Sequence, residues 1–217
     1  MSASPSSLAA LRSLLAAHFP EKNRKPAGIV PSGVAALDRA LGGGLPSGQL
    51  TELVSPKPSS GGQFVLGRLL LATRQLRQRI ALIDGADGFA PEAHPADALR
   101  HLIWVRCHAT AEALAAADLL VRDGNYAVLA IDLRGLAEKS LRQQPASTWY
   151  RLQRAAEISP AAVLILTPFA LVPAVPWRLE LTSPLPLAAR RQSQEMIAAR
   201  LAVVLTRGHT QREELTG

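Results

Sequence analysis

Apolar runs and amphipathic stretches alternate along most of this chain. Four short segments are almost continuously apolar, which predicts strands buried on both faces: residues 79–85, 102–107, 126–133 and 161–168. Three longer segments repeat apolar positions every three or four residues, which predicts helices: residues 64–78, 110–123 and 147–159. A further strand is expected over residues 49–54. This alternating order predicts an α/β fold with a mostly parallel sheet flanked by helices on both faces.

The two ends of this pattern differ from its middle. Residues 34–41 predict a short helix that ends at a glycine run, and residues 45–48 predict a turn. Near the other end, residues 177–184 and 199–207 alternate between apolar and polar side chains. Alternation of this kind predicts two antiparallel edge strands, joined here by a loop or a short helix.

An amphipathic helix is predicted near the N-terminus, ahead of a basic, proline-bounded linker. Its apolar stripe consists of Leu8, Leu11, Leu15 and Phe19. Such a helix cannot bury its stripe alone, so it packs on its own domain, on a second copy or on a partner. We expect these four residues to bind a partner. The predicted divisions are residues 1–28 for helix and linker, 29–208 for the core domain, and 209–217 for a polar tail.

The hydrophobic fraction, the aromatic fraction and the net charge limit the kinds of function that this chain can have. The chain has 217 residues, of which 48% are hydrophobic, so it can bury a sizeable core. Aromatic residues make up only 4%, which disfavours an extended base-stacking surface. The net charge is +7 and the basic residues are mostly Arg, which fits a nucleic-acid or acidic protein partner, or simply a GC-rich genome.

Cysteine usage and hydropathy point to a cytoplasmic protein. Cys107 is the only cysteine, so no intramolecular disulfide can form, and its apolar surroundings favour a core residue over a nucleophile. The sequence contains no run of about 18 apolar residues, so no membrane span is predicted. The first residues do not have the pattern of a signal peptide. Histidine and cysteine spacing indicates no metal site.

The stretch "VSPKPSSGGQFVLGRLL", from Val54 to Leu70, has the outline of a phosphate-binding loop. A Pro/Ser/Gly turn follows a strand and leads into a helix, whose N-terminus favours anions. The lysine and the hydroxyl that normally close such a loop are missing, since Gly62 and Gln63 stand in their places. The candidate nucleotide-binding residues, treated as a degenerate site, are Ser59, Ser60, Gly61, Gly62, Gln63 and Asp132.

Four segments together resemble the RecA family. "ALDRALGGGLPSGQLTELVSPKPSSGG" resembles the opening of the RecA recombinase core, and "ALIDGADGFAP" resembles its second core strand. "YAVLAIDLRGL" resembles the Walker B strand, and "AAVLILTP" the strand that senses the γ-phosphate. The resemblance spans about residues 31–207 and implies a RecA-like core. The first segment is specific, whereas the others match only in pattern.

Departures from that family pattern fall on its chemistry. The catalytic Glu of the family corresponds to Ala86 here, and the Gln of the fourth strand corresponds to Thr167. Only the Walker B acid remains, as Asp132, for which a structural role is favoured. The sequence therefore has no lysine to neutralise phosphate charge, no loop hydroxyl to bind Mg²⁺ and no Glu to activate water. We therefore expect no ATP hydrolysis and no cofactor, although the loop backbone still leaves residual nucleotide binding open.

A narrower resemblance is to the ImuA proteins, small RecA-like proteins of bacterial mutagenesis cassettes that are often mislabelled as the SulA division inhibitor. It implies a non-catalytic accessory protein in translesion synthesis and the SOS-type response to DNA damage. The implied partners are a Y-family polymerase-like protein, RecA and single-stranded DNA. Two alternatives stay open: a RecA- or KaiC-type DNA-dependent ATPase, and a SulA-type inhibitor of cell division. Homo-oligomer formation is also left open.

The RecA resemblance further implies that two loops face DNA. The loop after the Walker B strand carries Arg134, Lys139 and Arg142, and the segment after the fourth strand carries Trp177 and Arg178. Basic side chains there would neutralise phosphates, and the indole would stack on a base. The competing interpretations are an ordinary solvated face for the basic residues and edge-strand packing for Trp177.

Overall fold

A seven-stranded sheet forms the centre of the computed structural model, which describes residues 28–208. All neighbouring strands are parallel except the last pair, and their order across the sheet is β5-β4-β6-β7-β3-β8-β9. The strands are β3 (Leu50–Val54), β4 (Ile80–Asp84), β5 (Leu102–Arg106), β6 (Val128–Asp132), β7 (Ala162–Thr167), β8 (Trp177–Leu181) and β9 (Val203–Arg207). The predicted parallel sheet with an antiparallel C-terminal strand pair is therefore confirmed.

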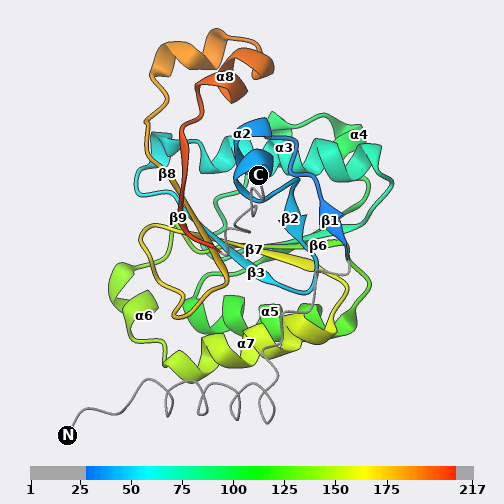
Figure 1. Cartoon of the computed structure of the whole chain (residues 1–217), viewed down its shortest axis with the longest axis vertical. Coiled ribbons are helices and arrows are strands. Elements are labelled where there is room, and N and C mark those ends of the chain that lie inside the picture. Colours follow the sequence, from blue (N-terminus) through cyan, green and yellow to red (C-terminus); the bar gives the residue numbers. More distant parts are fainter. Residues whose placement is uncertain (1–27, 209–217) are drawn as a thin grey trace, which may run out of the picture.

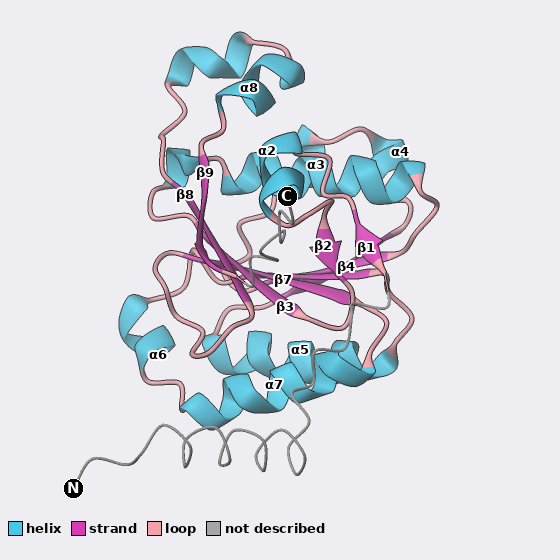
Figure 2. Ribbon diagram, viewed as in Figure 1, coloured by secondary structure: helices cyan, strands magenta, loops and turns pink. Residues whose placement is uncertain are grey.

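Helices cover both faces of this sheet, as Figure 1 shows. One layer holds α2 (Ala35–Ala40), α3 (Gly62–Gln75) and α4 (Ala96–Leu99). The opposite layer holds α5 (Thr110–Asp123), α6 (Glu138–Arg142) and α7 (Ala146–Ile158). Between β8 and β9, the chain extends away from the sheet and forms α8 (Gln194–Arg200), at the top of Figure 2. Single turns of 3₁₀-helix occur at Pro58–Ser60, Pro91–Ala93 and Leu187–Arg191.

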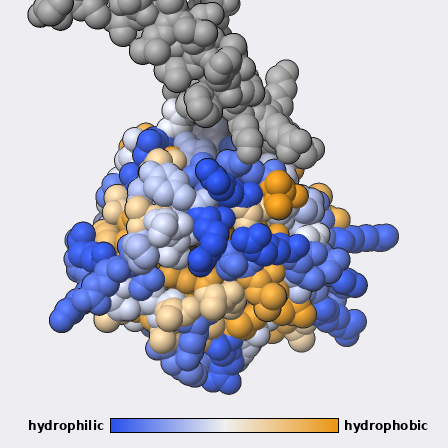
Figure 3. All heavy atoms as spheres, turned by 90° about the horizontal axis from the view of Figure 1, so that it is seen from below, coloured by the Kyte–Doolittle hydropathy of each residue, from blue (hydrophilic) through white to orange (hydrophobic). Residues whose placement is uncertain are grey.

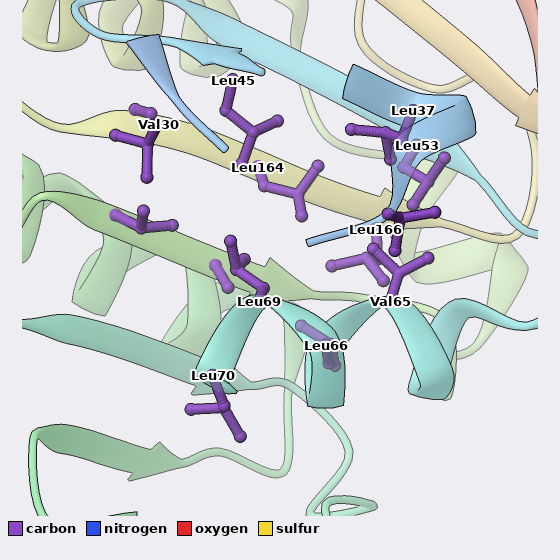
Figure 4. Packing of buried hydrophobic residues seen from close by; sticks show 14 of the residues in the cluster. Val30, Leu37, Leu45, Leu53, Val65, Leu66, Leu69, Leu70, Leu164 and Leu166 are labelled. Carbon is purple, nitrogen blue, oxygen red and sulfur yellow. The ribbon is translucent and has the colours of Figure 1, made fainter. Parts of the chain in front are cut away.

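Two hydrophobic clusters lie on opposite faces of the sheet because successive strand residues point to opposite sides. In β6, Val128 and Ala130 join the cluster under α3, whereas Leu129 and Ile131 join the cluster over α5 and α7. Figure 4 shows the first cluster, in which leucines of α3 meet leucines of β3 and β7. Each large aliphatic side chain buried in this way contributes about 1.5–3 kcal/mol.

Three local predictions need correction. The strand predicted at residues 102–107 is not buried on both faces, because β5 is at the sheet edge, where Ile103 is 48% exposed. Residues 45–48 are not only a turn, since β2 (Leu45–Pro46) pairs antiparallel with β1 (Ile29–Val30). The segment after β6, expected to be a loop, contains α6. Strand order decides the exposure of β5, and pairing with β1 decides the structure of residues 45–46.

The parallel strands bring polar residues together at one edge of the sheet. Asp84 and Asp132 are paired in register at the ends of β4 and β6, and Val54 pairs with Thr167 at the ends of β3 and β7. Ser55 follows directly after β3 and is buried. Ligands of open α/β sheets bind beyond the carboxyl ends of the strands. The candidate site is therefore built at this edge, between β3, β6 and the start of α3.

Candidate nucleotide site and basic loops

The loop between β3 and α3 has the shape of a phosphate-binding turn. The backbone N–H of Ser60 donates to the carbonyl of Lys57 at 2.9 Å, and the Ser60 hydroxyl accepts from the Lys57 N–H at 3.2 Å. Gly61 follows with φ of 98°, a left-handed conformation that glycine adopts without strain, and α3 begins at the next residue. The sequence thus folds as the resemblance implies, into a tight turn at a helix N-terminus.

Side chains from the C-terminal part of the chain cover this loop. The backbone N–H of Leu185 donates to the carbonyl of Ser59 at 2.7 Å. A Cβ added to Gly61 would lie 2.7 Å from Cδ1 of Leu201 and 3.4 Å from Cδ1 of Leu185. Ser60, Gly61 and the following glycine are accordingly buried. Apolar groups therefore occupy space beside the loop backbone, where a phosphate-binding loop has solvent and ligand.

The guanidinium of Arg134 connects two positions of the candidate nucleotide site. Its Nε donates to Oδ1 of Asp132 at 2.8 Å, and its Nη2 donates to Oδ2 at 2.5 Å. The same Nη2 donates to Oε1 of Gln63 at 2.8 Å. Both members of the ion pair are mostly buried, with side-chain exposures of 16% and 14%. The Walker B acid is thus neutralised by a cation of its own chain.

Arg134 also fills the space at the position where the family has its lysine. A Cβ added to Gly62 would overlap Nη1 of Arg134 and lie 2.8 Å from its Cζ. The guanidinium therefore lies directly against the backbone at the start of α3. Any side chain at position 62 requires Arg134 to move. The glycine at position 62 and the inward position of Arg134 are therefore parts of one arrangement.

The remaining positions of the family machinery have structural partners. The Thr167 hydroxyl donates to Oε1 of Glu52 at 3.0 Å and is fully buried. Asp84 accepts from the backbone N–H groups of Gly88 and Phe89 at 2.9 and 2.8 Å, which shapes the loop after β4. The side chain of Ala86 is a methyl group, with no polar or titratable atom.

Ser55 differs from the residues above because its side chain lacks a hydrogen-bond partner within residues 28–208. Its Oγ is buried and has no hydrogen-bond partner among the residues that the structure describes. It lies 3.0 Å from the position of a Cβ on Gly62, so it faces the start of α3. A buried hydroxyl without a partner is uncommon and costs free energy.

The second set of predicted DNA contacts is engaged within the protein. Nε of Arg178 donates to Oε2 of Glu52 at 2.5 Å, and Nη2 donates to the carbonyl of Val172 at 2.5 Å. Glu52 is fully buried and also accepts from the N–H groups of Leu171 and Val172. This network fixes the segment between β7 and β8. Arg178 is oriented inward, and a role in DNA binding stays a prediction.

Trp177 lies at the beginning of β8, away from the phosphate-loop edge. It pairs with Thr51, near the amino end of β3, and its Nε1 donates to Oε1 of Gln49 at 2.7 Å. Its ring packs against the hydrophobic cluster on the α3 side. This arrangement agrees with the alternative of edge-strand packing. The structure does not bring Trp177 together with the basic residues of the first loop.

Lys139 and Arg142 are exposed on α6, near the carboxyl edge of the sheet. Nε of Arg142 donates to Oε1 of Glu138 at 2.8 Å, and its guanidinium stacks over the ring of Phe169 at 4.0 Å. The loops that follow β6 and β7 therefore touch here. Of the five predicted DNA contacts, these two have the exposure that a phosphate contact requires.

The role of Arg134 is what sequence reasoning missed, since it was expected to face DNA. One signal was present: Arg134 follows Asp132 by two residues, and in extended chain such residues point to the same side. The aspartate and the arginine could therefore have been expected to pair. Contact with Gln63, 71 residues away, is a matter of tertiary structure.

Several sequence predictions concern other parts of the molecule. Cys107 is buried, and burial raises the pKa of its thiol, as expected for a core residue. Within residues 28–208, no group of three or more potential ligands could hold a metal ion, and no helix is long and apolar enough to cross a membrane. The predicted stripe of Leu8, Leu11, Leu15 and Phe19 lies outside these residues.

Comparisons with known proteins support the RecA-like assignment in part. No model of a protein family matches the chain. RecA of Saccharopolyspora erythraea is 32% identical over 115 residues, which cover 52% of this chain and 33% of that protein. RecA of Amycolatopsis mediterranei is 36% identical over 116 residues, with the same coverage. RecA of Clavibacter michiganensis is 37% identical over 113 residues, or 50% of this chain and 31% of that protein.

These matches cover only part of each protein. The aligned part spans about half of this chain and about a third of the curated relatives it matches. The similarity to RecA is thus distant and partial. The strand order and the antiparallel C-terminal pair are consistent with a RecA-like core.

Proposed function

We propose that this chain is a non-catalytic accessory protein in bacterial DNA-damage tolerance, of the kind that the ImuA resemblance implies. In this role it would act in translesion synthesis by binding other proteins and single-stranded DNA. The proposed protein partners are a Y-family polymerase-like protein and RecA itself. Such a protein retains the RecA-like core as a binding scaffold and has no need of nucleotide hydrolysis.

One observation carries the non-catalytic part of the proposal: Arg134 is bound to Asp132 and Gln63 and lies against Gly62. In a working site, a metal ion and phosphate groups would interact with these positions. Here the guanidinium neutralises the acid, holds the glutamine and fills the volume of the lysine. Nucleotide entry would have to break a mostly buried ion pair before gaining any contact.

Nucleotide binding without hydrolysis is the second candidate, favoured by Ser55. Its unpartnered, buried hydroxyl faces the start of α3, where backbone N–H groups and the helix dipole attract anions. If Arg134 swung outward, it would itself be a phosphate ligand. The chain would then be a nucleotide-switched adaptor, and the release of Asp132 would be part of the switch.

Binding of a fluorescent ATP analogue with Mg²⁺ separates the two candidates. The native chain is compared with Arg134→Ala, with the double variant Gly62→Lys, Arg134→Ala, and with RecA as a positive control. Arg142→Ala serves as the matched control, because it removes an exposed arginine from the same segment. We expect no binding by the native chain at millimolar analogue, and at least tenfold tighter binding by the double variant.

Two outcomes would reject the non-catalytic proposal. Micromolar, Mg²⁺-dependent binding by the native chain would establish the second candidate, and analogue turnover would establish an enzyme. If Arg134→Ala weakened such binding whereas Arg142→Ala did not, Arg134 would be a phosphate ligand.

Binding of a labelled single-stranded oligonucleotide tests the proposed DNA contact. The double variant Lys139→Ala, Arg142→Ala should weaken binding and reduce the slope of log affinity against log salt by about 1.4 for two phosphate contacts. Arg100→Ala is the control, since its side chain is 77% exposed and lies in the opposite helix layer. Equal losses in both variants would show that the charge of the whole molecule, and no defined surface, is responsible.

A further inference from the structure

An apolar surface lies on the outer side of the α5 and α7 helices, and we name it the α5–α7 face. It consists of Leu119, Tyr150 and Ile158, whose exposed fractions are 70%, 49% and 74%. Figure 3 views the molecule from this side and shows a band of hydrophobic residues bordered by hydrophilic ones. Single exposed apolar residues are normal, but an apolar band with a polar rim, such as Figure 3 shows, indicates a binding surface.

A shallow hollow of about 580 Å³ gives this face its shape. Its lining combines Tyr150, Ala155 and Ile158 with Arg122, Arg151, Arg154 and Ser147. Asp118 forms ion pairs with Arg122 and Arg151, so one carboxylate connects the two helices at the rim. The face is therefore a preformed surface on two packed helices.

The chain enters the described structure beside one end of this face. The carbonyl of Gly28 accepts from the N–H of Ser47 at 2.9 Å. The next residue, Gly48, donates its N–H to the carbonyl of Ala161 at 2.9 Å, and a Cβ on it would lie 3.5 Å from the carbonyl oxygen of Ser159. Gly28 thus lies close to the C-terminal end of α7, where Ile158 is located. Residues 1–27 start from this point.

The lengths of the two partners match. Residues 20–27, between the predicted stripe and Gly28, reach at most about 26–29 Å when extended. A helix that holds the stripe from Leu8 to Phe19 would be about 18 Å long, close to the length of about 20 Å that the 13 residues of α7 give. Its stripe of Leu8, Leu11, Leu15 and Phe19 lies on one side of a helix. It offers apolar side chains over the same length that the α5–α7 face exposes.

We infer that residues 8–19 dock as a helix on the α5–α7 face of their own chain. The stripe covers Leu119 and Ile158, and the linker folds back from Gly28 along the end of α7. Of the three arrangements that the sequence leaves open, this one is favoured by the position of Gly28. A segment tethered this close is present at millimolar effective concentration, so its own chain is the first surface that it meets. This inference does not depend on the proposed function.

Hydrogen exchange of the full chain, followed by mass spectrometry, tests this docking. Two double variants and one single variant are compared with the native protein. The face variant is Leu119→Asp with Ile158→Asp, and the stripe variant is Leu11→Asp with Leu15→Asp. The single variant Leu76→Asp is the control. Leu76 is 47% exposed and follows α3 in the opposite helix layer, so it matches the face residues in type and exposure. Light scattering gives the molecular mass at each protein concentration.

In the native protein, we expect amides of residues 8–19 to exchange at least tenfold more slowly than in an unfolded chain, at a monomer mass and independently of concentration. The face and stripe variants should both lose this protection, and the control should keep it. Unchanged protection of β6 and β7 amides shows that each variant is folded. The inference fails if residues 8–19 are unprotected, or if the face variant leaves them protected. It also fails if protection rises with concentration together with a dimer mass, which would mean that the segment docks on a second copy.

Discussion

Arg134 and Gly62 are in direct contact, and the guanidinium of the first occupies the space that any side chain at the second would need. The two residues lie 72 positions apart in the chain. In a RecA-like phosphate loop, position 62 would carry the cation that neutralises phosphate. In this protein a cation is present at the same place but comes from the strand end that carries Asp132. A positive charge therefore lies beside Gly62, and it belongs to the residue that follows β6 by two positions.

The first prediction concerns the stability that Arg134 provides. Replacing it with Ala leaves Asp132 mostly buried without its cation and removes the hydrogen bond to Gln63. We expect the free energy of unfolding to fall by about 1.5–3 kcal/mol, as measured by urea denaturation. Arg142→Ala is the control and should cost less than about 0.5 kcal/mol, because its pair with Glu138 is exposed. Equal effects of the two substitutions would contradict the structural role of Arg134.

The second prediction concerns the coupling of Gly62 and Arg134. Gly62→Ala introduces a Cβ that overlaps the guanidinium, so it should destabilise the native protein by about 1–3 kcal/mol. In the Arg134→Ala background the closest remaining neighbour of that Cβ is the Ser55 Oγ, at 3.0 Å, so the same change should cost much less. A double-mutant cycle by urea denaturation measures this difference, expected at about 1 kcal/mol or more. Additive effects of the two changes would show that the residues do not share this space.

A third prediction addresses Glu52 and Arg178, the ion pair under the segment between β7 and β8. Glu52 is fully buried, and its oxygens accept four hydrogen bonds from side-chain and backbone donors. Glu52→Gln leaves Arg178 without a counter-charge, so we expect a loss of about 3–5 kcal/mol. Amides of residues 168–176 should also exchange faster.

Thr167→Val is the matched control for this site, since it removes one neutral donor to Glu52 and keeps the ion pair. Its expected cost is about 0.5–1.5 kcal/mol. If Glu52→Gln cost no more than Thr167→Val, the ion pair would not be what fixes this segment.

The fourth prediction is a loss of stability in mild acid. Burial lowers the pKa of His94 and of His101 below the ordinary histidine value. The unfolded chain therefore binds more protons than the folded chain as the pH falls through about 6.5. Stability is full above that pH and declines below it. The midpoint of urea denaturation should decrease between pH 7 and pH 5.

Replacing both histidines, as His94→Gln with His101→Gln, should flatten this decrease. His108→Gln is the control and should preserve it, because the two partly buried histidines remain. A pH profile that is as steep in the double variant as in the native protein would assign the effect to other groups.

Most of the fold could be predicted from the sequence because its strands and helices have strong local patterns. The apolar runs of β4, β6 and β7 are buried on both faces, as predicted, and α5 occupies residues 110–123 as expected. The strand at residues 102–107 was read as buried because its composition resembles theirs. Its place at the sheet edge depends on strand order, which no local pattern contains.

The candidate site was predictable only as far as residues close in sequence define it. The turn, Gly61 and the start of α3 follow from a few adjacent residues, and so does the absence of the lysine. The sequence by itself therefore determined the class of fold and which residue types stand in the loop. Tertiary structure alone decided what fills the site, because Arg134 meets Gln63 and Gly62 only when β6 and α3 pack together. Contacts between distant segments arise from the packing of whole elements, so the inward orientation of Arg134 and Arg178 became visible only in the folded chain.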